Sequence, residues 1–307
     1  MSSRPQRPRR SCHCVPATSP RMVAKAASLA ADLVFFDLED SVAAGAKGHA
    51  ARQAVVDALL AGRSRARGVG VRVNAVDTPQ WHEDVAHVVG RAGAALDVVI
   101  LPKVDDPTHI TLIDDLLATI ERRDGLPVGT IGLEAQIESA RGLLEVERIA
   151  AASPRLESLV FGPGDYAASM GMPVTTIGGT IDGYPGDPYH YPLSRIVVTA
   201  RAFGLQAIDG PHADVRDAAG LRASAARSRA LGFDGKWSIH PDQIVVLNEV
   251  YGVSQDDLAH AVRVLDAYRR SLQAGHGAAL LDGEMIDEAT RRMAEGVVAR
   301  ARLTAAP

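Results

Sequence analysis

The sequence is short of cysteine, of long apolar runs and of net charge, and each shortage excludes a class of protein. Only two of its 307 residues are cysteines, Cys12 and Cys14. That number argues against a disulfide scaffold, and no second Cys/His cluster exists to complete a structural zinc site. No apolar run approaches the roughly 20 residues of a membrane-spanning helix. A formal net charge of −4 gives no electrostatic reason to expect a nucleic acid as partner.

Glycine-rich phosphate loops are also missing. Neither Gly-x-Gly-x-x-Gly nor a Walker A motif occurs where a strand would meet a helix, so a doubly wound nucleotide-binding sheet lacks its fingerprint. What the chain has instead is a regular alternation of apolar strand-like runs with amphipathic helical runs, which predicts an α/β (β/α)₈ TIM barrel. The predicted strands are residues 11–15, 32–36, 70–74, 97–101, 128–136, 156–161, 205–208 and 235–239. The predicted helices include residues 21–30, 49–60, 108–122, 140–151, 194–203 and 215–231.

The two ends of the chain depart from this alternation. Residues 1–10 are basic and rich in proline, and they are followed by Cys-His-Cys where a signal peptide needs an apolar stretch. We therefore expect a flexible arm and a cytoplasmic protein. The barrel should occupy residues 11–250. The pattern of residues 251–307 predicts a C-terminal helical extension, with helices at 255–272 and 287–302 joined by a glycine-rich linker at 274–283.

Two acidic residues follow buried strands directly. Glu138 comes after the fifth predicted strand, and Asp165 comes after the sixth. A buried carboxylate is costly unless it is paired or coordinates a cation, and neighbouring parallel strands end at the same face of a barrel. Carboxylate oxygens are the ligands of hard cations. The pair therefore predicts a Mg²⁺ site.

Other polar residues follow the remaining strands and should gather at the same face. They include Glu39 and Asp40 after strand two, Arg72 in strand three and Lys103 after strand four. So many acids in one place require basic groups or a cation beside them. Two other interpretations stay open. The acids could be helix caps, and Lys103 could be the Schiff-base lysine of a metal-independent aldolase.

At this point the chain resembles the HpcH/HpaI aldolase and citrate lyase β-subunit family, and within it the malyl-CoA lyases. The resemblance extends from about Cys14 to Ala294. Its motifs are the segments 36–42 (FDLEDSV), 72–74 (RVN), 101–103 (LPK), 136–138 (QIE), 162–165 (GPGD), 209–211 (DGP), 235–237 (GKW), 239–241 (IHP) and 283–287 (GEMID).

The resemblance implies a Mg²⁺-dependent lyase. Such an enzyme cleaves a 3-hydroxyacyl-CoA, for example malyl-CoA, β-methylmalyl-CoA or citramalyl-CoA, into a small α-keto acid and an acyl-CoA. Glu138 and Asp165 would hold the metal, and Arg72 would stabilise the thioester enolate. Glu39 and Asp40 would orient the waters on the metal. Asp287 would exchange the proton with the enolate carbon, supplied by a neighbouring subunit of a homotrimer or homohexamer, with the C-terminal extension acting as a lid.

The resemblance also implies where the thiol carrier binds. The family has an aromatic residue, an Arg and a Lys around the first strand and helix. Here these positions are Cys14, Ser19 and Lys25, and Arg21 lies two residues beyond the usual Arg. Further substrate contacts would come from Gly164, Asp165, Ile239 and His240. Because of these changes the carrier is either free CoA or a carrier-protein thioester, as in a citrate lyase β-subunit working within a complex.

Overall fold

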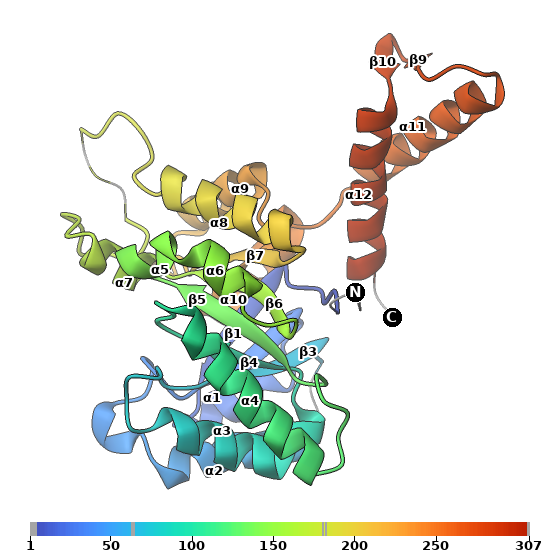
Figure 1. The fold of residues 1–307 in the computed structure, drawn as a ribbon. Coiled ribbons are helices and arrows are strands. Elements are labelled where there is room, and N and C mark those ends of the chain that lie inside the picture. The colour runs from blue at the N-terminus through green and yellow to red at the C-terminus, as the bar shows by residue number, and fades with distance from the viewer. Residues whose placement is uncertain (1–4, 63–64, 180, 182, 306–307) are drawn as a thin grey trace. The chain divides into compact units, whose positions relative to one another are not determined.

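Eight parallel strands close into a barrel with helices around its outside in the computed structural model (Figure 1). The structure describes residues 5–62, 65–179, 181 and 183–305. Each strand is bonded to the next along the chain, and β8 is bonded back to β1, so the barrel closes without an edge. This confirms the predicted (β/α)₈ barrel. The strands are β1 (Ser11–Pro16), β2 (Leu33–Asp37), β3 (Gly68–Arg72), β4 (Val98–Leu101), β5 (Gly132–Ile137), β6 (Leu156–Phe161), β7 (Gln206–Asp209) and β8 (Gly235–Ser238).

The helices of the barrel lie between the strands, as the alternation predicts. Within the described residues none of the helices is long and apolar enough to cross a membrane. The helices are α1 (Pro20–Ala26), α2 (His49–Leu60), α3 (Trp81–Ala92), α4 (Pro107–Arg123), α5 (Ala140–Leu144), α6 (Val146–Ala151), α7 (Pro163–Ser169), α8 (His190–Phe203), α9 (Ala218–Leu231) and α10 (Pro241–Val250), with short 3₁₀ turns η1 (Ala44–Ala46) and η2 (Gly93–Ala95).

Some element boundaries differ from those expected. The fifth strand begins at Gly132 rather than at residue 128, because Gly129 has a left-handed φ of 92° and Thr130 closes a turn onto Pro127. The single helix expected at 140–151 is two short helices, since the backbone at Glu145 leaves the helical region with ψ near 2°. Both changes alter connections on the outside of the barrel and leave the strand ends in place.

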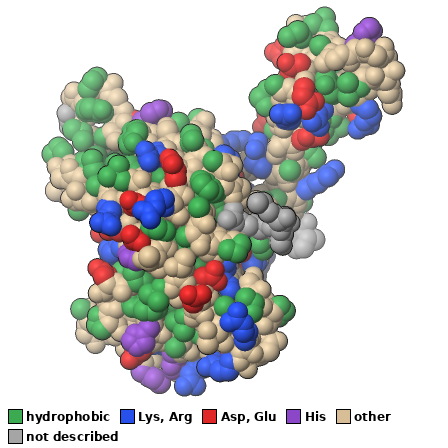
Figure 2. Space-filling view, viewed as in Figure 1, with side chains coloured by type: hydrophobic (Ala, Val, Ile, Leu, Met, Phe, Trp, Pro, Cys, Tyr) green, Lys and Arg blue, Asp and Glu red, His purple; other side chains and the backbone are tan. Residues whose placement is uncertain are grey.

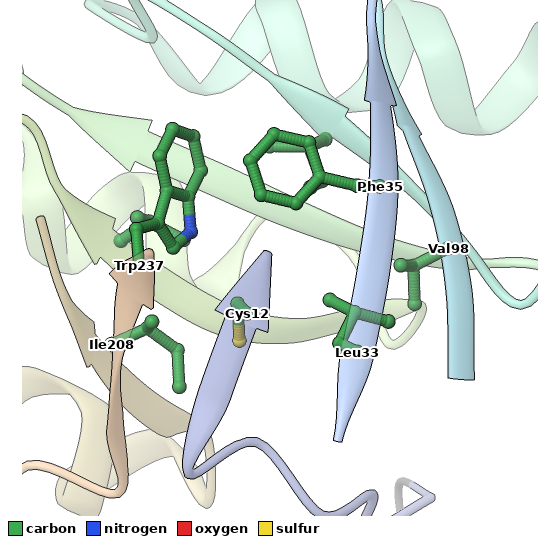
Figure 3. Packing of buried hydrophobic residues seen from close by; sticks show 8 residues of the cluster. Cys12, Leu33, Phe35, Val98, Ile208 and Trp237 are labelled. Atoms are coloured by element: carbon green, nitrogen blue, oxygen red, sulfur yellow. The ribbon is translucent and has the colours of Figure 1, made fainter. Parts of the chain in front are cut away.

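Inward-facing apolar side chains fill the barrel interior (Figure 3). Phe35 and Trp237 pack with ring centroids 4.5 Å apart. Cys12 is fully buried among them and Cys14 packs against the same cluster, so the two thiols share one face of β1, and both are free. The other members are Leu33, Val98, Ile100, Val160 and Ile208. Close packing of this kind makes the interior a core rather than a pore.

An arginine closes the end of the barrel at which the strands begin. Arg9 is 1% exposed and lies among side chains from three strands. Its guanidinium is 2.7 Å from Glu134 Oε1 and 2.6 Å from Glu157 Oε2, and it also donates to Gln206. Gly235 makes room for this segment, since a Cβ there would lie 1.7 Å from the carbonyl oxygen of Arg9.

This network differs from the flexible arm expected over residues 1–10. Arg7 and Arg10 are also anchored, Arg7 at 2.6 Å from Asp97 and Arg10 at 2.8 Å from Asp32. The expectation fails for residues 7–10 because a basic, proline-rich sequence does not reveal acidic partners placed far along the chain. Residues 1–4 lie outside the described part.

The chain folds as two compact units, residues 1–250 and residues 251–307. The second contains α11 (Gln255–Gln273), a hairpin of β9 (Ala279–Leu281) and β10 (Glu284–Ile286), and α12 (Glu288–Thr304). Its core is formed by Ala261, Val264, Ala267, Tyr268, Ile286 and Ala294. The hairpin takes up the second half of the predicted glycine-rich linker, with a tight turn at Asp282 and Gly283, which have φ of 53° and 88°.

Replacing Arg9 should be strongly destabilising. Arg9→Ala leaves Glu134 buried without its cation and Glu157 with Arg7 alone, and breaking a buried pair costs about 3–5 kcal/mol. Urea unfolding followed by circular dichroism measures the loss. The matched control is Arg222→Ala, whose side chain is 53% exposed and pairs with the exposed Glu249, and which should cost much less. Equal losses in the two variants would contradict a specific role for Arg9.

Candidate active site

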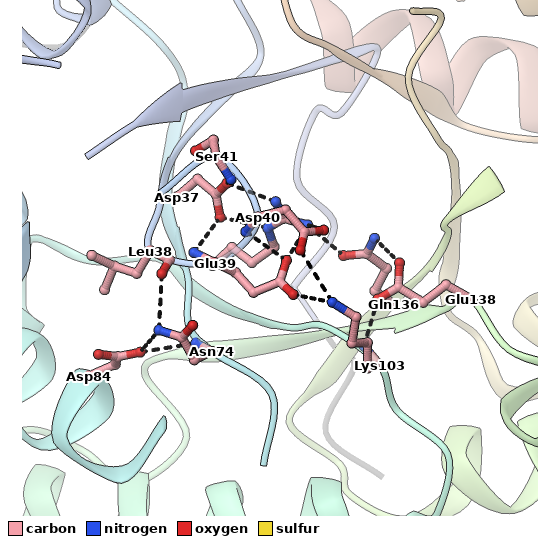
Figure 4. Close-up of polar contacts among 11 residues, drawn as sticks. Asp37, Leu38, Glu39, Asp40, Ser41, Asn74, Asp84, Lys103, Gln136 and Glu138 are labelled. Carbon is pink, nitrogen blue, oxygen red and sulfur yellow. Dashed lines mark hydrogen bonds and ion pairs between the residues drawn. The ribbon is translucent and has the colours of Figure 1, made fainter. Parts of the chain in front are cut away.

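The C-terminal end of β2 forms the acidic side of the barrel mouth (Figure 4). Asp37 is fully buried, and its two oxygens accept the backbone N–H groups of Glu39 and Ser41, both at 3.0 Å. These bonds hold the loop after β2 in a tight turn. Sequence reasoning singles out Glu39 and Asp40 but misses Asp37, although Asp37 begins the same acidic run.

Arg72, the last residue of β3, neutralises this loop. Its Nε and Nη2 atoms each lie 2.7 Å from an oxygen of Asp37, a bidentate pair, and Nη1 lies 3.1 Å from Glu39 Oε2. Its guanidinium also lies 5.3 Å from the centre of the Trp237 ring. Burial alone would raise the pKa of Asp37, but Arg72 and the turn hydrogen bonds lower it to about 2.

Asp84 connects this loop to the helices outside the barrel. Its Oδ2 accepts both the backbone N–H and the side-chain amide of Asn74, and that amide also donates to the carbonyl oxygen of Leu38 at 3.0 Å. The other oxygen of Asp84 is 2.6 Å from Arg52 in α2. The loop after β2 is therefore braced from α2 and α3 as well as from β3.

Lys103 follows β4 and has a left-handed φ of 51°, which is uncommon for a residue with a side chain. This conformation directs its backbone N–H to Glu138 Oε1 at 2.7 Å, while its ammonium pairs with Glu39 and lies 3.3 Å from Asp40. Burial would lower the pKa of Lys103, but Glu39 and Asp40 raise it above its ordinary value. A protonated ammonium cannot attack a carbonyl, so the geometry disfavours the Schiff-base interpretation.

Glu138 lies just beyond β5 and is 2% exposed. It also accepts a bond from Gln136, and Gly162 makes room for it, since a Cβ there would lie 2.2 Å from Glu138 Oε2. Asp165 is in the first turn of α7. Burial and then the charge of Asp165 raise the pKa of Glu138 to about 8.

These two carboxylates fit a hard divalent cation. The raised pKa of Glu138 shows that its negative charge, next to that of Asp165, is not fully compensated by the protein. No group of three or more His, Cys, Asp or Glu suited to a metal occurs among the described residues. Two carboxylates suit Mg²⁺, which commonly keeps several of its waters.

The residues predicted to hold the thiol carrier come together in one cavity. It has a volume of about 420 Å³, and its walls include Cys14, Ser19, Arg21, Lys25, Ile239 and His240. Gly164 is elsewhere, in the first turn of α7 beside Asp165. The cavity brings two cations, Arg21 and Lys25, to one wall of otherwise largely apolar side chains.

One polar residue of this cavity is missed by the sequence. His13 is 5% exposed, and its Nδ1 lies 2.9 Å from Ser238 Oγ. Burial, with the positive charges of His240 and Lys25, lowers the pKa of His13 to about 4. A single histidine between two strand cysteines gives no local signal of such a position.

Asp287 belongs to the second unit and caps α12. Its Oδ1 accepts the N–H groups of Ala289 and Thr290 at 2.9 and 3.0 Å, and these bonds lower its pKa. All the side-chain hydrogen bonds described for Asp287 use Oδ1. Asp287 therefore caps α12 through Oδ1, and its Oδ2 takes no part in the cap.

Comparison with known proteins agrees with this arrangement. The family model described as HpcH/HpaI aldolase/citrate lyase matches residues 10–241. The chain is 39% identical to the L-malyl-CoA/β-methylmalyl-CoA lyase of Cereibacter sphaeroides, over 98% of this chain and 97% of that protein. It is 34% identical to the malyl-CoA/β-methylmalyl-CoA/citramalyl-CoA lyase of Chloroflexus aurantiacus, over 98% and 90%.

One solved structure is also similar to this chain over nearly its full length. The CitE protein of Mycobacterium tuberculosis, in complex with magnesium, acetoacetate and coenzyme A, superposes with a TM-score of 0.74 at 33% identity, over 98% of this chain and 99% of that chain. With a family model matched over most of the barrel and relatives matched over nearly the full chain, this protein belongs to the HpcH/HpaI aldolase/citrate lyase family.

Proposed function

We propose that this protein is a Mg²⁺-dependent carbon–carbon lyase acting on a 3-hydroxyacyl-CoA such as malyl-CoA, β-methylmalyl-CoA or citramalyl-CoA. Its products would be glyoxylate or pyruvate and an acyl-CoA. The observation that carries the proposal is the buried Glu138 just beyond β5, with Asp165 in the first turn after β6, at a mouth that also contains the buried Arg72. The names of the relatives support the substrate class.

Glu138 and Asp165 would hold the cation, which when bound supplies a Lewis acid for the keto-acid oxygens. In the cleavage the hydroxyl group would pass its proton to the carboxylate of Asp287, and the carbon–carbon bond beside it breaks. The electron pair of that bond becomes the enolate of the thioester. Arg72, fixed by Asp37, would stabilise the negative charge on the thioester oxygen. Glu39 and Asp40, held by Arg72 and Lys103, would orient water at the metal.

The cavity beside β1 and α1 would hold the thiol carrier. Arg21 and Lys25 are placed on its wall to bind phosphate, and Cys14, Ser19, Ile239 and His240 would contact the rest of the carrier. The backbone around Gly164 and Asp165 would contact the keto acid. Free CoA is the proposed carrier, and a carrier-protein thioester in a citrate lyase-like complex is the second candidate, favoured by Cys14 at the family's aromatic position.

Asp287 would deliver the proton to the enolate carbon, completing the acyl-CoA. We propose that it comes from a neighbouring subunit of a homotrimer or homohexamer, with the C-terminal unit acting as a lid. Its Oδ2, which takes no part in the helix cap, is the oxygen that would carry the proton. The free thiols Cys12 and Cys14 support a reducing compartment such as the cytoplasm.

Removing one metal ligand tests the reaction class. Purified protein should release keto acid from malyl-CoA, β-methylmalyl-CoA or citramalyl-CoA with Mg²⁺, and a chelator should abolish the release. Glu138→Gln should lower kcat/KM by more than about a hundredfold, because the metal loses one of two protein ligands. The control is Glu147→Gln, an exposed glutamate on α6 that should keep full activity. Activity that survives the chelator would exclude a metal-dependent lyase.

Mg²⁺ binding should tighten as the pH rises. The pKa of Glu138 is raised from 4.5 to about 8, so without metal the folded protein binds an extra proton and loses stability as the pH rises through this range. Mg²⁺ competes with that proton, so its affinity should rise about tenfold per pH unit from pH 6 to 8. Melting curves with and without Mg²⁺ at pH 6 and 8.5 measure this. Glu138→Gln should abolish the pH dependence, and a Mg²⁺ effect equal at both pH values would contradict the assignment.

Mixing two inactive variants tests whether Asp287 acts between subunits. Asp287→Asn should fold normally, because asparagine also caps helices, and should lose most of its kcat. After it is mixed with Glu138→Gln and the subunits exchange, about a quarter of the sites should contain both native residues and regain activity. If an affinity tag on one variant recovers the other, which shows that mixed oligomers form, and no activity returns, Asp287 does not act in trans.

A further inference from the structure

A second hollow lies outside the barrel, between α2, α3 and α4. We call it the basic groove. It has a volume of about 630 Å³ and is lined by His49, Arg52, Glu83, Ala86, His87, Gly90, Arg91 and Arg123. None of these residues contacts the substrate in the proposed reaction, although Arg52 also holds Asp84 behind the mouth. Figure 2 shows histidine and basic side chains gathered over α2 and α3, at the lower part of the view.

The hollow arises from the order of residues along α3. Glu83, His87 and Arg91 are four residues apart and therefore share one face of the helix. Ala86 and Gly90 on the same side are small and leave the space between the helices open. The lining thus combines long, mostly basic side chains from three helices with two short residues of α3.

Gly90 has a further role. A Cβ at this position would lie 2.8 Å from Nη2 of Arg123, so its absence lets the guanidinium of Arg123 extend from α4 onto α3. Glycine weakens the middle of a helix. Asp124 holds the same guanidinium from the other side at 2.7 and 2.9 Å.

Three arginines and one glutamate line the groove. Arg52 is neutralised by Glu83 and by Asp84, the latter at 2.6 Å, and Arg123 is paired through Nε and Nη2 with Asp124, which is not among the lining residues. Arg91, in contrast, has no ion-pair partner among the described residues.

His87 lies at the centre of this positive field. Its ring is edge-to-face with that of His49 at 4.9 Å, and its Nε2 lies 3.2 Å from Gln53 Oε1. Burial first, and then Arg91, His49 and Arg52, lower the pKa of His87 below its ordinary value. Burial is the largest of these causes and the neighbouring positive charges add to it, and such charges attract an anion.

We propose that the basic groove is a binding site for a doubly charged oxyanion, namely a phosphate group, with Arg91, Arg123 and His87 as its ligands. Guanidinium groups bind phosphate oxygens through paired hydrogen bonds, and a protonated imidazole adds a donor between them. The site does not rest on the proposed lyase activity, because it shares no residue with the mouth. The phosphate could be free or part of a nucleotide.

Charge reversal tests the site directly. Isothermal titration calorimetry with pyrophosphate and with ADP, on Mg²⁺-free protein, should show binding to the native chain. Arg91→Glu should weaken it at least about tenfold, the loss of one charged hydrogen bond. Arg229→Glu is the matched control, since Arg91 and Arg229 are both exposed residues in the last turn of a helix, and it should bind as the native protein does. Tighter pyrophosphate identifies a free phosphate, and tighter ADP a nucleotide.

A second readout follows His87 itself. Sulfate keeps its double charge between pH 6 and 8, so binding that favours protonated His87 should tighten as the pH falls over this range. The imidazole resonance of His87, assigned with His87→Asn, should show a raised pKa when sulfate is present. Gly90→Ala should weaken binding by displacing Arg123, without loss of thermal stability.

Three outcomes would overturn the proposal. One is equal affinity in Arg91→Glu and Arg229→Glu. Another is a His87 resonance that sulfate does not shift. The third is a change in oligomeric mass in Arg91→Glu, measured by light scattering, which would make the groove an interface between copies of this chain.

Discussion

The bidentate pair between Arg72 and Asp37 is the interaction on which the arrangement of the mouth depends. Both groups are buried, so each would be costly alone. Asp37 also accepts the backbone N–H groups of Glu39 and Ser41 in the turn after β2, and Nη1 of Arg72 pairs with Glu39. One ion pair therefore fixes the loop after β2, the orientation of Arg72 and the position of Glu39.

The mouth separates its acids into two groups with different chemistry. Asp37, Glu39 and Asp40 form ion pairs with Arg72 and Lys103. Glu138 and Asp165 form no such pair among the described residues, and burial, followed by the charge of Asp165, raises the pKa of Glu138 although Arg72 lowers it. The cation that we propose at Glu138 and Asp165 would let five carboxylates share one end of the barrel.

The sequence predicts the parts of this arrangement that local patterns encode. Strand-helix alternation is enough for the barrel, and the rule that parallel strands end at one face is enough to bring Arg72, Lys103 and Glu138 together. Arg9 is missed because its partners Glu134 and Glu157 lie more than a hundred residues away, within strands that read as apolar. His13 and the basic groove are missed for a related reason. Each depends on side chains from different elements that meet only when the helices pack.

The bracing of the mouth by Asp84 affects how substitutions in this protein should be interpreted. Asp84 holds Asn74, and through it the carbonyl of Leu38, from a helix outside the barrel, while Arg52 holds Asp84. Neither Arg52 nor Asp84 faces the barrel mouth, yet either substitution would release the segment that carries Asp37 and Glu39. A survey of activity along the chain would therefore include α2 and α3 among its sensitive positions. A loss of activity at those positions would reflect a less rigid loop after β2 rather than a lost contact with the substrate.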